Sequence, residues 1–126
     1  MLPNEVYRLC VQGGLIVGSV ALRMAGLIPP GTPKDYDILV PFVKWSRIAP
    51  LIPRNAELNS FGGWKFRTTK GIEVDVWPGD LQGYLAACKS RYGGQVVAID
   101  FINNRVFSSR THELFPIESP PTEVRT

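Results

Sequence analysis

Two aspartates separated by one residue, Asp35 and Asp37, are the side chains in this sequence whose spacing best suits chemistry. They alternate with the apolar residues Tyr36 and Ile38, which is the pattern of a half-buried strand. Successive side chains of a strand point to opposite faces, so both carboxylates are expected on one face. Carboxylate oxygens are the ligands that Mg²⁺ and Mn²⁺ prefer. The pair therefore predicts part of a divalent-metal site.

A second acidic strand is expected downstream, where Glu73 and Asp75 alternate with Val74 and Val76. The two acids again share one face and the two valines the other. If this strand lies beside the first, Asp75 brings a third carboxylate to the same cation. Glu73 and Asp80 are rival third ligands, and we interpret Glu73 as an exposed hairpin residue.

A tight turn precedes both acidic strands. The apolar run Leu15–Val17 predicts a short buried strand, and Gly18-Ser19 predicts the turn from that strand into a helix. Gly13 and Gly18 have the spacing of a P-loop, but no lysine follows the second glycine, so that interpretation is rejected.

These three segments, in this order, resemble the minimal nucleotidyltransferase pattern of the DNA polymerase β superfamily. The pattern consists of an apolar strand ending in Gly-Gly or Gly-Ser, an Asp-x-Asp pair, and a later strand with one acid between apolar residues. The resemblance covers Gly14 to Trp77. It implies an α+β catalytic core that transfers a nucleoside monophosphate from a nucleoside triphosphate, such as ATP, to a hydroxyl group on RNA, protein or a small molecule.

The resemblance also implies a role for each residue. Asp35 and Asp37 would hold the Mg²⁺ or Mn²⁺ that accompanies the triphosphate. Asp75 would join them on a second metal and orient or deprotonate the acceptor hydroxyl. Gly18 would let the backbone approach the β- and γ-phosphates, and Ser19 would add a hydroxyl and an amide there.

Basic residues near these segments are candidates for contacts with phosphate or acceptor. Lys34 precedes the first acidic strand, and Lys65 and Arg67 lie in the strand expected before the second. Lys34 and Arg67 are predicted to bind nucleotide. The net charge of +3 is compatible with such ligands and equally with an ordinary surface.

The chain also departs from the family pattern. The spacer before Asp35 is longer than in many members, and the loop 29–33 is expected to absorb the excess. The helical domain that usually binds base and acceptor is missing. The alternative function is therefore a non-catalytic interaction module on the same fold, such as an antitoxin-like protein that binds a partner protein or a second copy. A metal-dependent nuclease is a weaker enzymatic alternative.

Length and composition predict one domain of residues 1–115 and an extended or disordered tail of residues 116–126. The chain has 126 residues, of which 44% are hydrophobic, which is sufficient for one core. No apolar run approaches the roughly 18 residues that span a bilayer, and the N-terminus lacks a basic signal region, so we expect a cytoplasmic protein with no membrane partner. Cys10 and Cys88 are expected on buried helix faces, and the lone His112 is expected on the surface.

The periodicity predicts a small mixed sheet with helices packed on one face, as the resemblance implies. Asn4 is expected to cap the first helix, and the second is expected to pack through Leu27 and Ile28. The predicted strands comprise residues 15–17, 35–40, 57–61, 64–69, 71–77, 96–101 and 105–107, and the predicted helices comprise residues 4–13, 19–28, 42–51 and 81–92.

Overall fold

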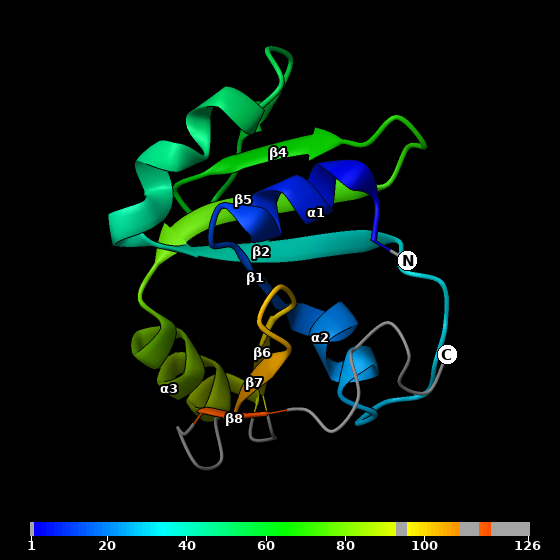
Figure 1. Cartoon of the computed structure of the whole chain (residues 1–126), viewed down its shortest axis with the longest axis vertical. Coiled ribbons are helices and arrows are strands. Elements are labelled where there is room, and N and C mark those ends of the chain that lie inside the picture. Colours follow the sequence, from blue (N-terminus) through cyan, green and yellow to red (C-terminus); the bar gives the residue numbers. More distant parts are fainter. Residues whose placement is uncertain (1, 93–95, 109–113, 117–126) are drawn as a thin grey trace.

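The chain folds into a mixed α+β structure built on one continuous sheet (Figure 1). The computed structural model describes residues 2–92, 96–108 and 114–116, with side chains for residues 2–88 and 96–108. The α-helices are α1 (Asn4–Val11), α2 (Gly18–Met24) and α3 (Leu81–Tyr92), and the 3₁₀ helices are η1 (Phe42–Arg47) and η2 (Ala49–Leu51). The strands are β1 (Leu15–Val17), β2 (Asp35–Pro41), β3 (Glu57–Leu58), β4 (Trp64–Arg67), β5 (Glu73–Gly79), β6 (Val97–Asp100), β7 (Arg105–Ser108) and β8 (Leu114–Pro116).

The sheet places the two acidic strands side by side. Within the described residues its order is β3-β4-β5-β2-β1-β6-β7-β8. Strands β2 and β5 pair in parallel, whereas every other neighbouring pair is antiparallel. The crossover from β2 to β5 contains η1, η2 and the β3–β4 hairpin. The two acidic strands therefore run in the same direction at the centre of the sheet.

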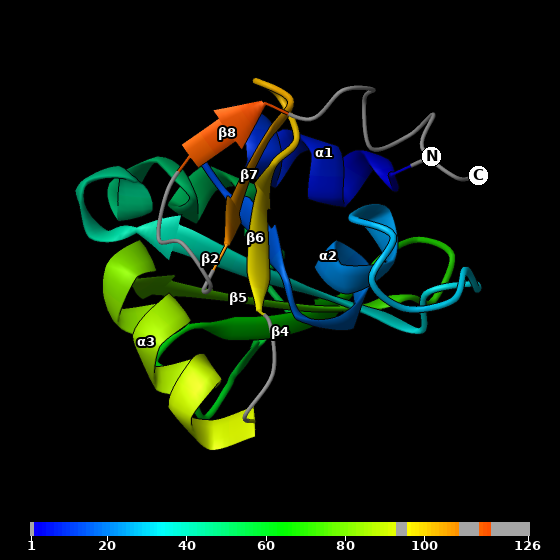
Figure 2. The same ribbon diagram turned by 90° about the horizontal axis from the view of Figure 1, so that it is seen from below.

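Helices cover both faces of this sheet, which corrects the expectation that they pack on one face. Residues of α1 and α2 join Ile16, Ile38 and Val74 in the larger core cluster. Leu81 and Tyr84 of α3 pack instead against the smaller cluster on the opposite face, formed by Leu15, Val17, Leu39 and Ala98. Figure 2 shows α3 on one side of β2 and β5, with α1 and α2 on the other. The physical reason is that Leu15, Val17 and Leu39 are apolar side chains on this opposite face, and they also have to be buried away from water.

The predicted alternation of the acidic strands is confirmed. Tyr36, Ile38 and Val40 are buried on the inner face of β2, as are Val74 and Val76 on β5. The intervening carboxylates therefore point to the face that carries α3. Strand β5 runs from Glu73 to Gly79 rather than over 71–77, and β4 ends at Arg67 because Thr68 turns the chain.

Several predicted ends of elements are wrong. Asn4 is the first residue of α1 and makes no capping bond, since Pro3 occupies the N-cap position and accepts from the amide of Tyr7. Helix α2 ends at Met24, because Gly26 takes a φ of +76° and Leu27 N–H then bonds to the carbonyl of Leu22. Leu27 is consequently exposed.

Other differences concern shorter segments. Residues 42–51 form two short 3₁₀ helices instead of one helix, and the predicted strand 57–61 is reduced to Glu57–Leu58. The hairpin predicted across Asn103-Asn104 is confirmed, and Asn104 has the positive φ of 58° that the turn requires. Strand β8 was not predicted, and His112 and residues 117–126 lie outside the described residues. No helix among the described residues is both long and apolar enough to cross a bilayer.

Candidate active site

The pairing of three strands brings the predicted site residues together. On β2, Asp37 is opposite Val17 of β1 on one side and opposite Asp75 of β5 on the other. Asp35 is opposite Glu73 in the same parallel ladder. Neighbouring strands lie about 4.8 Å apart and same-face residues about 6.7 Å apart along a strand, so four carboxylates originate from one small rectangle of backbone.

Gly18 comes directly after β1 and closes one side of this rectangle. Its φ of +73° is a conformation that glycine adopts readily and other residues rarely. A methyl group at this position would lie 2.5 Å from Oδ2 of Asp37. The missing side chain of Gly18 therefore makes the room in which the Asp37 carboxylate lies.

The pKa of Asp37 is strongly affected by this crowding. Burial, and then the charges of Asp35, Asp75 and Glu73 in that order, together raise the pKa of its carboxyl from 3.8 to about 6. Desolvation and like-charge repulsion both disfavour the ionised form. A divalent cation placed among these groups would remove the repulsion that raises this pKa.

Asp75 is held in place by Asn59, which sequence reasoning missed. The Asn59 amide nitrogen donates to Oδ1 of Asp75 at 3.1 Å and to the carbonyl of Trp64 at 2.9 Å. Its amide oxygen accepts from the backbone N–H groups of Phe61 and Gly63 at 3.0 and 2.9 Å. Asn59 thus fixes the β3–β4 turn and one Asp75 oxygen at once. The segment Asn59-Ser-Phe-Gly-Gly63 has the composition of a turn, which could have indicated the bonds between Asn59 and the amides of Phe61 and Gly63.

The basic residues of β4 face the same side of the sheet as the carboxylates. Lys65 is opposite Asp75 in the ladder and forms an ion pair with Glu73 at 3.6 Å. Arg67 is exposed, and its guanidinium donates to the carbonyl of Gly71 at 2.9 Å. Arg67 is therefore bound to its own hairpin turn in this structure.

Tyr84 of α3 is the second residue that sequence reasoning did not assign to the site. Burial and the Cys88 thiol raise the pKa of its phenol well above the ordinary value, and Asp37 adds to the rise. A hydrogen bond from the Gly18 backbone amide acts in the opposite direction on the pKa. The Tyr84 side chain thus lies against the Gly18 turn on the face of the sheet that carries α3. Its position depends on how α3 crosses the sheet, which no local pattern indicates.

The remaining predicted residues lie at the margin. Ser19 is exposed at the start of α2, and Lys34 is exposed just before β2. Within the part of the chain that the structure describes, Lys34 makes no ion pair with the carboxylates, since Lys65–Glu73 is the one pair found there. Cys10 is buried and Cys88 half-buried, and both are free thiols.

The side chains have the oxygen donors that a hard cation prefers, but they do not yet surround one point. Among the described residues, no group of three or more His, Cys, Asp and Glu side chains is arranged to hold a metal ion. Asp35, Asp37 and Asp75 would need to turn toward a shared position to become ligands together.

Comparison with known proteins identifies no similar protein. No protein-family model matches the sequence, and neither a curated protein nor a solved structure matches the chain.

Proposed function

We propose that this chain is a metal-dependent nucleotidyltransferase that moves a nucleoside monophosphate from a nucleoside triphosphate to a hydroxyl acceptor. The observation that carries the proposal is the register of three strands, which puts Asp37 beside Asp75 and against the Gly18 turn. The order of these segments in the chain supports the same proposal, because it is the order of the nucleotidyltransferase pattern.

In this proposal Asp35, Asp37 and Asp75 hold Mg²⁺ or Mn²⁺. When bound, the ions supply Lewis-acid stabilisation of the charge on the transferring phosphoryl group. The raised pKa of Asp37 supports the assignment, since a bound cation would offset the charges of the neighbouring carboxylates that raise it. Asn59 holds Asp75 in a fixed direction, which is the task of a group that supports a ligand.

The chain's own groups then have distinct tasks. The Asp75 carboxylate orients the acceptor hydroxyl and receives its proton. The Gly18 amide and Ser19 contact the triphosphate. Tyr84 now shares a hydrogen bond with the Gly18 amide, so the phenol has to move aside before a phosphate oxygen can accept from that amide. Lys34 and Arg67 are candidates for further phosphate contacts once Arg67 leaves the Gly71 carbonyl.

Transfer of label from α-³²P nucleoside triphosphates tests this function. ATP, GTP, CTP and UTP are each incubated with the protein, Mg²⁺ or Mn²⁺, and RNA or protein acceptors. We expect metal-dependent labelling by the wild type, none by Asp37→Asn or Asp75→Asn, and full labelling by Glu57→Gln, which alters an exposed acid of the same sheet face. A protein that labels no acceptor, but forms a stable partner complex unaffected by both aspartate substitutions, would be an interaction module instead.

A further inference from the structure

A second cavity lies at the opposite end of the acidic strands from the carboxylates. It has a volume of about 510 Å³ and is bordered by Pro41 and Gly79, the last residues of the parallel strands β2 and β5. Three residues of β2 lie between Asp37 and Pro41, which are about 13 Å apart along an extended chain. Crevices beyond the carboxyl ends of parallel strands are frequent ligand sites, and this volume suits a small molecule.

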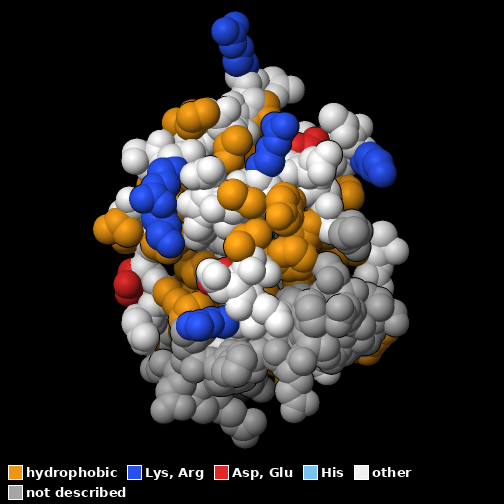
Figure 3. Space-filling model, viewed as in Figure 1, with side chains coloured by type: hydrophobic (Ala, Val, Ile, Leu, Met, Phe, Trp, Pro, Cys, Tyr) orange, Lys and Arg blue, Asp and Glu red, His pale blue; other side chains and the backbone are white. Residues whose placement is uncertain are grey.

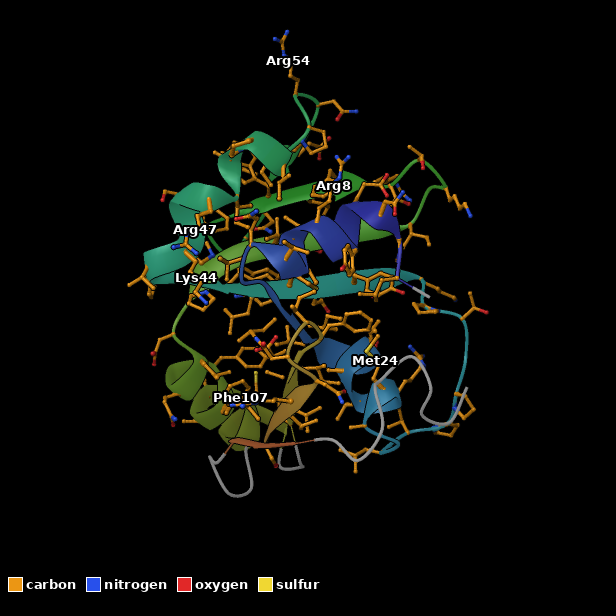
Figure 4. The ribbon with its side chains drawn as sticks, viewed as in Figure 1. Arg8, Met24, Lys44, Arg47, Arg54 and Phe107 are labelled. Atoms are coloured by element: carbon orange, nitrogen blue, oxygen red, sulfur yellow. The ribbon has the colours of Figure 1, made fainter. Side chains whose placement is uncertain are left out.

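Two cations line this cavity from one short helix. Lys44 and Arg47 are three residues apart in η1, and side chains at that spacing lie on the same side of a 3₁₀ helix. Figure 4 shows both projecting from η1, with the Lys44 amine on the side toward α3. Neither forms an ion pair or hydrogen bond within the described ranges 2–88 and 96–108. Two adjacent cations are therefore available to one anionic group.

Lys44 is also held in position. Gly13 follows α1 with a φ of +109°, and a Cβ on Gly13 would overlap the Lys44 side-chain carbons. The aliphatic part of Lys44 is thus packed against the backbone of Gly13, which leaves its ammonium group at the cavity. Ordering the side chain in advance lowers the entropy that binding would cost.

The acids that line the same cavity are already occupied. Asp80, the residue before α3, accepts from the Gly83 amide at 2.7 Å. Asp100 accepts from the backbone and side-chain nitrogens of Asn103 at 3.1 and 2.8 Å. Both carboxylates keep their charge but already have N–H donors, whereas Lys44 and Arg47 have no hydrogen-bond partner among the described side chains.

Apolar side chains form much of the remaining lining of the cavity and of its rim. Leu15, Leu81 and Phe107 lie in its lining, while Phe42 and Val43 of η1 are 64% and 84% exposed beside the cations. Figure 3 shows Lys and Arg side chains where Figure 4 labels Lys44 and Arg47, with hydrophobic side chains next to them. A ligand that fills this space needs both a charged end and an apolar body.

We propose that this cavity binds a small organic anion, a carboxylate or phosphate carried on an aromatic or aliphatic body. The anionic group lies between Lys44 and Arg47, and the apolar body contacts Leu15, Leu81 and Phe107. This site requires no metal ion and is independent of the proposed transferase activity.

Isothermal titration with four matched probes in EDTA tests the proposal: 1-naphthoate, 1-naphthyl phosphate, neutral 1-naphthol and inorganic phosphate. We expect saturable binding of the two naphthyl anions, with the other two probes about tenfold weaker, since each lacks one of the two recognised features. Lys44→Met and Arg47→Met should each weaken naphthoate binding about tenfold. The control Arg54→Met, which alters an exposed arginine outside the cavity, should leave it unchanged.

Thermal melting of each variant establishes that the fold is retained, and methionine preserves the apolar stem that packs on Gly13. The proposal is overturned if neither naphthyl anion saturates, if naphthol binds as well as naphthoate, or if both cavity variants bind like the wild type. It is also overturned if the small probes fail while an acidic peptide with an apolar anchor binds and loses affinity in the same variants. That last result would assign the surface to a macromolecule.

Discussion

The backbone of Gly18 lies directly against the carboxylate of Asp37, so that a side chain at residue 18 and a carboxylate at residue 37 cannot both occupy their present positions. This contact joins the turn after β1 to the middle of β2, and the ladder joins Asp37 to Asp75.

Gly18→Ala should displace Asp37 as well as strain the backbone. We expect it to destabilise the fold by about 2–3 kcal/mol, of which about 1–2 kcal/mol comes from the left-handed φ alone, and to abolish nucleotidyl transfer. Gly26→Ala is the matched control, because Gly26 has a φ of +76° but no atom within 4 Å of an added Cβ. Chemical denaturation measures the free energy of unfolding of both variants, and the difference between them is the cost of the steric clash with Asp37. Equal destabilisation of the two would show that the Asp37 contact has no energetic effect.

Asp37→Asn should change the dependence of stability on pH. The folded-state pKa of Asp37 is raised from 3.8 to about 6, so the native protein binds this proton more tightly than the unfolded chain. The contribution of this group to stability is complete below about pH 4 and is lost as the pH rises through about 6. The asparagine variant lacks this loss, so at about pH 8 it should be more stable than the wild type by roughly 1–2 kcal/mol, a value reduced for solvent screening.

Urea unfolding at several pH values measures this difference. The gap between Asp37→Asn and the wild type should close at about pH 4, and Glu57→Gln, an exposed acid, should show no comparable gap at any pH. A wild type that is more stable than the variant at about pH 8 would mean that Asp37 has a favourable partner there.

Asn59→Ala should loosen both the β3–β4 turn and Asp75. The substitution removes the bonds to Trp64 and Asp75 and leaves the amides of Phe61 and Gly63 without their acceptor. We expect a loss of about 2–3 kcal/mol in the free energy of unfolding, as for a multiply bonded polar side chain. Asn55→Ala replaces an exposed asparagine nearby and should cost less than about 0.5 kcal/mol. Similar unfolding curves for the two variants would contradict the structural role of Asn59.

Tyr84→Phe should release the Gly18 amide. Loss of the hydrogen bonds to Gly18 and Cys88 should cost about 1–2 kcal/mol of stability, while the affinity for a nucleoside triphosphate should rise about fivefold because the phenol no longer competes. Fluorescence titration with a labelled triphosphate measures this affinity. A weaker affinity in the variant would indicate that Tyr84 contacts the nucleotide instead of competing with it.

The sequence was sufficient for those parts of the site that depend on local alternation. Tyr36 and Ile38 turn inward because a strand alternates, and this alone put Asp35 and Asp37 on one face. The convergence of Asp37 and Asp75 was predicted only on the condition that their strands are neighbours. The residue pattern of a strand does not indicate which other strand pairs with it. The register that sets Asp37 against Asp75 is a property of the assembled sheet.

The parts that were missed depend on tertiary contacts or on single-residue backbone geometry. Tyr84 reaches Gly18 only because α3 crosses the face opposite α1 and α2, and helical periodicity does not specify which face a helix covers. Helix α2 ends at Met24, because the left-handed conformation of Gly26 interrupts a pattern that Leu27 and Ile28 would otherwise have continued.

The central claim is that Asp35, Asp37 and Asp75 together hold a divalent cation, and Mn²⁺ binding followed by electron paramagnetic resonance tests it most directly. The free Mn²⁺ signal is recorded during titration of wild type, Asp37→Asn, Asp75→Asn and Glu57→Gln at neutral pH. The account predicts saturable binding by the wild type and by Glu57→Gln, and binding at least about tenfold weaker in both site variants. Equal Mn²⁺ binding by all four proteins, or none by the wild type, would contradict it.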